Sequence, residues 1–196
     1  MRAIASFILA VMAVCCASPA AADELALAPE EYAVLSVLID SLYAGDYALV
    51  VIGPRTERWS INAPLHVLQE QWPDLKQETI DSLIVRNSMT ADVADEFAIH
   101  GDYRIVPEAE YREVLGGGDS PDWDRFDSMF VDAQGYLVVS RVGFDAERTQ
   151  ALVYFSNAYR CSGSRIRPAT RNIAYLRKTE GSWELIGVER GLQALY

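Results

Sequence analysis

The stretch Tyr136-Leu-Val-Val-Ser-Arg-Val-Gly-Phe144, followed closely by Thr149-Gln-Ala-Leu-Val-Tyr-Phe155, decides the fold of this chain. Two similar runs follow at residues 171–178 and 182–188. Each run is rich in Val, Ile, Leu, Tyr and Phe and is bounded by Gly, Asp, Asn or Ser, as is typical of half-buried β-strands. We therefore expect an antiparallel meander of four or five strands, made chiefly by residues 136–188.

Upstream of the meander, apolar residues recur mostly at helical spacing. Pro29 with two following glutamates is a typical helix start, and Pro73 breaks one helical pattern into two. Short strands are expected at 47–52 and 103–106. Helices are predicted at 29–42, 64–72, 75–87, 89–97, 107–115 and 123–130. The predicted fold class is α+β, with N-terminal helices packed on a C-terminal antiparallel sheet of four or five strands.

The first 22 residues have the features of a signal peptide. Arg2 precedes an apolar stretch that is too short to span a bilayer, and Ala20-Ala-Ala22 supplies small residues for cleavage. Lipidation at Cys15 or Cys16 fits less well, because the preceding residues are not the usual small ones. The sequence thus predicts a signal peptide at 1–22, a single domain at 23–196, and a periplasmic or secreted location.

The mature chain is strongly acidic. Without Arg2 it holds 16 basic residues against 28 acidic ones, which disfavours a nucleic acid partner, because phosphate binding requires basic surface. It carries no transmembrane pattern. Cys161 is its single cysteine, so no internal disulfide can form.

The meander carries five short sequence features that recur together in one family. They are Ser140-Arg-Val-Gly-Phe144, Thr149-Gln-Ala-Leu-Val-Tyr154, the pair Tyr159 and Cys161, Tyr175-Leu-Arg-Lys178 and Gly181-Ser-Trp183. With the helix at 29–43, these features resemble a family of small exported bacterial proteins that have no assigned activity. The resemblance implies an exported α+β domain with an antiparallel sheet and brings no catalytic residue. In that family the segment from Cys161 to Tyr175 is short and glycine-rich, whereas here it is long and arginine-rich.

Basic residues are concentrated near the C-terminus: from Arg148 to Thr179 there are seven and no acid. Four of them are Arg160, Arg165, Arg167 and Arg171. Guanidinium groups can hold a carboxylate or a phosphate by two parallel hydrogen bonds, so these four are the candidate ligand-binding residues for an anionic small molecule or protein partner. The alternative is that they pair with the protein's own carboxylates on a solvated surface.

Cys161 lies among arginines that would favour its thiolate form, but a nucleophile also needs a base. Only His66 and His100 are available, both distant in sequence, so a buried inert thiol is the favoured explanation of Cys161. The chain has no nucleophile elbow, phosphate loop or dinucleotide fingerprint. No catalytic residue and no cofactor is therefore predicted.

Two groups of residues are of types that can bind a metal ion. His66 and Glu70 share a helix face, but two ligands make an incomplete zinc site. Four aspartates could suggest calcium but lack the spacing of a calcium loop, and helix N-terminal acids explain them better: Asp119, Asp122, Asp124 and Asp127. No metal site is predicted.

These observations favour a non-catalytic exported binding or interaction module that uses its arginine-rich loop at 157–171. One alternative is a small hydrolase or thiol enzyme that uses Cys161 with a histidine. Another is an acidic inhibitor that meets a basic cell-wall enzyme through its negative surface.

Overall fold

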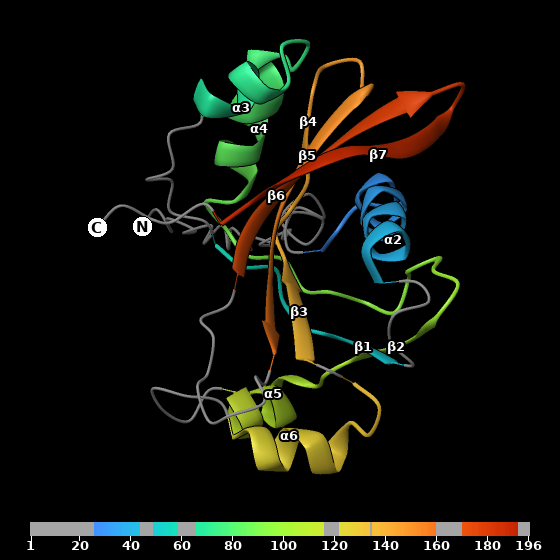
Figure 1. Ribbon diagram of the computed structural model, residues 1–196, viewed down its shortest axis with the longest axis vertical. Helices are drawn as coiled ribbons and strands as arrows, with labels where there is room; N and C mark the ends of the chain where they lie inside the picture. Colours follow the sequence, from blue (N-terminus) through green and yellow to red (C-terminus); the bar gives the residue numbers. More distant parts are fainter. Residues whose placement is uncertain are drawn as a thin grey trace, which may run out of the picture.

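The computed structural model describes residues 26–43, 49–58, 66–115, 122–133, 135–159 and 170–191. These residues form five helices and a seven-stranded mixed sheet (Figure 1). The helices are α2 (Pro29–Tyr43), α3 (His66–Gln71), α4 (Gln77–Arg86), α5 (Glu108–Leu115) and α6 (Trp123–Met129). The strands are β1 (Leu49–Ile52), β2 (Asp102–Ile105), β3 (Gly135–Val139), β4 (Gly143–Phe144), β5 (Gln150–Tyr159), β6 (Thr170–Thr179) and β7 (Ser182–Arg190).

The strand order is β2-β1-β3-β5-β6-β7, with β4 paired to β5. Strands β3, β5, β6 and β7 pair antiparallel, so the α+β class and the predicted meander are confirmed. The sheet is larger than expected, because β1 lies parallel to both β2 and β3. The expectation of purely N-terminal helices is also wrong, since α5 and α6 lie between β2 and β3 in the chain. Parallel partners are joined by long crossovers, which leave no turn signal in the sequence.

The two faces of the sheet are covered by different helices. Helix α2 packs on one face, against alternate residues of β5 such as Val153 and Phe155. On the other face α3 and α4 cover one end, where Trp72 lies on Tyr175. Helices α5 and α6 cover the opposite end of that face, where Trp123 lies on Tyr136 (Figure 1). Side chains alternate between the faces of a strand, so β5 contributes to all three clusters.

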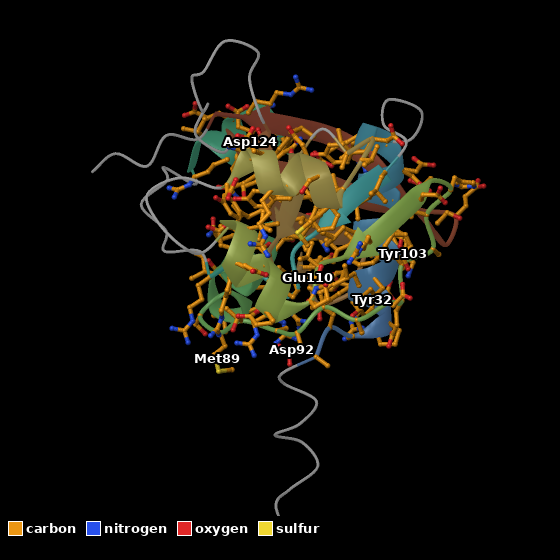
Figure 2. The ribbon with its side chains drawn as sticks, turned by 90° about the horizontal axis from the view of Figure 1, so that it is seen from below. Tyr32, Met89, Asp92, Tyr103, Glu110 and Asp124 are labelled. Atoms are coloured by element: carbon orange, nitrogen blue, oxygen red, sulfur yellow. The ribbon has the colours of Figure 1, made fainter. Side chains whose placement is uncertain are left out.

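The segment from Ala91 to Gly101 is not helical, which corrects the helix predicted at 89–97. Side chains of α2 explain the difference, because Tyr32 Oη accepts a hydrogen bond from the Ala94 N–H at 2.8 Å and Ser36 Oγ accepts one from the Ala98 N–H at 2.9 Å. Backbone donors bound in this way are not available for a helix. Phe97 is buried, and its ring centroid lies 5.2 Å from that of Tyr32 and 5.5 Å from that of Tyr103. Tyr32 and Tyr103 lie on the same side of the molecule in Figure 2.

None of the helices in the described ranges is long and apolar enough to cross a membrane.

Candidate functional site

The Ser140–Phe144 stretch follows β3 and includes β4. It forms a junction between the sheet and helices α2 and α4. Glu31 of α2 is completely buried beneath it and accepts hydrogen bonds from the Ala28 and Val142 N–H groups at 3.0 and 3.1 Å. The same carboxylate lies 3.2 Å from Arg141 Nη2 and 2.6 Å from Arg86 Nη2. Burial opposes ionisation of Glu31, but these hydrogen bonds and positive charges outweigh it and lower its pKa. Glu31 therefore stays ionised and ties α2 to α4 and to the sheet.

Gly143 explains why this junction tolerates no larger residue. A Cβ atom at Gly143 would lie 2.4 Å from the backbone nitrogen of Leu83, so α4 could not keep its position. The residues at 140–144 thus serve packing and charge balance.

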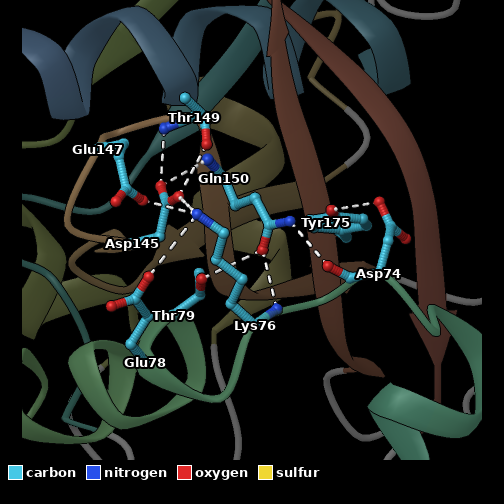
Figure 3. A network of polar contacts seen from close by, with 9 residues as sticks. All are labelled: Asp74, Lys76, Glu78, Thr79, Asp145, Glu147, Thr149, Gln150 and Tyr175. Carbon is cyan, nitrogen blue, oxygen red and sulfur yellow. Dashed lines mark hydrogen bonds and ion pairs between the residues drawn. The ribbon is translucent and has the colours of Figure 1, made fainter.

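A second polar cluster connects the start of α4 with the turn between β4 and β5 (Figure 3). The Lys76 ammonium lies 2.7 Å from Asp145 Oδ2, 2.6 Å from Glu147 Oε2 and 3.7 Å from Glu78 Oε1. The three carboxylates are close enough together to hold a metal ion, but the lysine ammonium lies among them. Burial opposes ionisation of Asp145, yet hydrogen bonds from Lys76, Gln150 and Thr149 lower its pKa. This cluster is a satisfied structural link between two segments.

A third group of polar residues lies on the sheet face that α3 to α6 cover, and it contains one of the predicted site residues. Val138 of β3, Ser156 of β5 and Arg171 of β6 are direct neighbours across adjacent strands. Glu57 follows β1, and its N–H donates to the Val139 carbonyl at 2.9 Å. The Ser156 hydroxyl donates to Glu57 Oε2 at 3.3 Å. We call Glu57, Ser156 and Arg171 the charged row.

Arg171 is only half-exposed, yet its guanidinium makes neither a hydrogen bond nor an ion pair with any described residue. Its charge does act on Glu57 and on Tyr154. A guanidinium offers five donors in a planar fork that matches carboxylate and phosphate oxygens. Among the described residues, Arg86 Nε and Trp123 Nε1 are the buried side-chain nitrogens without a hydrogen-bond partner, and no nitrogen of Arg171 is among them. The Arg171 donors therefore face solvent, where a ligand can reach them.

Glu57 is a half-buried carboxylate with a perturbed pKa. Burial raises the pKa of Glu57 above its ordinary value, against the charge of Arg171 and the Ser156 hydrogen bond. Burial also raises the pKa of Tyr136 to about 12, with a smaller contribution from the negative charge of Glu57. A titratable group perturbed by desolvation beside a specific charge partner is characteristic of functional sites. The charged row is therefore the candidate binding site.

Of the four predicted arginines, the structure places Arg171 in this site. Arg160, Arg165 and Arg167 lie outside the described residues, as does Cys161. In the sequence they lie between β5 and β6.

The histidines do not meet the charged row in the described parts of the chain. His66 is the first residue of α3, and its side chain is not described. His100 is exposed just before the edge strand β2, with Nδ1 2.7 Å from Asp40 Oδ2. Of the aspartates considered as calcium ligands, Asp119 lies outside the described residues. Asp122 is the N-cap of α6, and its side chain accepts a hydrogen bond from the Arg125 N–H at 3.0 Å.

Sequence reasoning missed Glu57 because it stands in a polar stretch after β1 that resembles an ordinary loop. Glu57 lies next to Ser156 because β1 pairs with β3 and β3 pairs with β5.

Comparison with known proteins adds no functional assignment: no protein family, no curated protein and no solved structure matches this chain.

Proposed function

We propose that this protein is an exported, non-catalytic binding module that holds the anionic group of a ligand or partner at the charged row. Arg171 supplies donors there, and Arg160, Arg165 and Arg167 add positive charge from the connecting segment. The guanidinium of Arg171, which no described residue engages, is the observation that most supports this function.

The signal peptide predicted at 1–22 supports export to the periplasm or beyond. The acidic composition disfavours a nucleic acid partner.

A binding role is also favoured over the thiol-enzyme alternative. His100 stands before β2, which is separated from β5 by β1 and β3, and its ring faces Asp40. Cys161 follows the end of β5 in the sequence. Two strands therefore separate His100 from the strand that precedes Cys161.

Calorimetric titration with acetate and with inorganic phosphate tests the proposed function. Replacing Arg171 with Gln is expected to weaken binding about tenfold or more, because a hydrogen bond to a charged group contributes about 1.5–3 kcal/mol. Reversing charge in Arg165→Glu with Arg167→Glu should weaken it further. The matched control is Arg112→Gln, which removes an exposed guanidinium paired with Glu108 on α5. Equal affinities for wild type, R171Q and R112Q would contradict the proposal.

The enzyme alternative is tested with Cys161→Ala, His66→Ala and His100→Ala. All three should bind acetate and phosphate as the wild type does and should rescue any phenotype of a deletion strain. Loss of rescue in C161A, with binding intact, would instead favour thiol chemistry.

A further inference from the structure

The charged row has opposite charges at its two ends. Ser156 lies directly opposite Arg171 on the neighbouring strand, and its hydroxyl donates a hydrogen bond to the Glu57 carboxylate. The Glu57 N–H donates to the carbonyl of Val139, the last residue of β3. Neighbouring strands are about 4.8 Å apart. Glu57, bonded to Val139 of β3, and Arg171 of β6 therefore stand on opposite sides of Ser156. Glu57 and Arg171 sense each other's charge but make no ion pair.

This arrangement limits which ligands can bind well. An anion that approaches Arg171 also approaches the negative charge of Glu57, and a like charge near a half-buried carboxylate is unfavourable. A cation that approaches Glu57 meets Arg171 in the same way. A ligand that carries both charges satisfies both groups, because its anionic end can accept from Arg171 while its cationic end donates to Glu57.

We propose, on the basis of the function proposed above, that the charged row recognises a zwitterionic α-amino-acid group, with the carboxylate at Arg171 and the ammonium at Glu57. Ser156 keeps the Glu57 carboxylate oriented through its hydroxyl. Glu57 is then the residue that determines specificity, since its negative charge makes simple anions such as acetate bind more weakly than zwitterions.

Three probes that differ by one charge each test this inference: L-alanine, N-acetyl-L-alanine and L-alaninamide. Dissociation constants are measured by NMR titration at pH 7.5 for the wild type, Glu57→Gln and Arg171→Gln, with Arg112→Gln as the control. Wild type and R112Q should bind L-alanine about tenfold more tightly than N-acetyl-L-alanine or L-alaninamide.

Each of the two site variants should lose the ability to distinguish L-alanine from one of the other two probes. E57Q keeps the shape of the side chain and should bind L-alanine and N-acetyl-L-alanine equally. R171Q should bind L-alanine and L-alaninamide equally. Circular dichroism confirms that each variant is folded before its titration.

The inference is overturned if wild type binds N-acetyl-L-alanine as tightly as L-alanine, if E57Q keeps the wild-type ratio, or if none of the three probes binds. Binding of acetate and phosphate that depends on Arg171 would, in those cases, leave the general binding function standing. If acetate and phosphate binding did not depend on Arg171, the proposed binding function would be contradicted as well.

Discussion

Two buried or half-buried glutamates show how surroundings decide the behaviour of one residue type. Glu31 receives two backbone N–H groups and two guanidinium groups, which lower its pKa despite burial. Glu57 receives one hydroxyl at 3.3 Å, and burial raises its pKa. Fully compensated charges stabilise a fold, whereas poorly compensated ones usually mark function.

Replacing Glu31 with Gln should lower the free energy of unfolding by about 3 kcal/mol, because two arginines would lose their buried counter-charge. Urea unfolding at pH 7 measures this effect. Glu31 has a lowered pKa in the folded state, so its contribution is present above the ordinary value of 4.5 and is lost as the pH falls through the lowered value. The control Glu110→Gln removes a partly exposed partner of Arg104 and should change stability by less than about 1 kcal/mol. Equal effects of E31Q and E110Q would contradict the role of Glu31.

Replacing Glu57 with Gln should have the opposite effect and raise the thermal unfolding midpoint at pH 7. The pKa of Glu57 is raised on folding, so the ionised carboxylate destabilises the native state at pH values above that raised pKa. Below the ordinary value of 4.5 the carboxyl is protonated in both states, and the difference between E57Q and wild type should vanish. Thermal scans from pH 3.5 to 8 provide the measurement. A midpoint for E57Q below that of wild type at pH 7 would show that the carboxylate is structural.

At the scale of elements, the contact between β4 and α4 depends on a missing side chain. Gly143→Ala would place Cβ within 2.4 Å of the Leu83 nitrogen, and we expect a loss of about 2 kcal/mol or more, because backbone must shift. Gly101→Ala is the matched control, since a Cβ there meets nothing within 4 Å. It should leave stability within about 1 kcal/mol of wild type. Chemical denaturation compares the two, and an unaffected G143A would show that α4 is not held as described.

The elements themselves could largely be predicted from local patterns. The meander strands, α2 and α6 follow directly from apolar periodicity and from the turn residues that bound them. The helix expected at 89–97 was wrong, because hydrogen bonds from Ala94 and Ala98 to α2 side chains override local propensity. The parallel pairing of β1 with β2 and β3 could not be predicted, since long-range register has no local signal.

At the scale of the molecule, the candidate site was only half predictable. Segregation of basic residues made Arg171 a candidate, and its binding role stays a prediction. Glu57 gave no signal, because its environment is created by strands that are distant from it in sequence. The same distance explains why only the folded chain reveals a site with two opposite charges.

Export gives a prediction for the whole chain. When the full sequence is expressed in a bacterium with a general secretion pathway, intact mass spectrometry of the exported protein should show a chain that begins at Asp23. Blocking secretion should leave the 196-residue precursor in the cell. A lipid adduct on Cys15 or Cys16 would instead show a membrane-anchored lipoprotein, and an uncleaved chain outside the cytoplasm would contradict the leader.

The central claim is that the Arg171 guanidinium contacts the ligand, and NMR of arginine Nε–Hε signals tests it most directly. During titration with L-alanine, the Arg171 signal should move and its exchange with water should slow, because the bound carboxylate accepts its hydrogen bonds. The signal of Arg112 should stay in place. Ligand-induced shifts elsewhere in the protein while the Arg171 signal does not move would contradict the account.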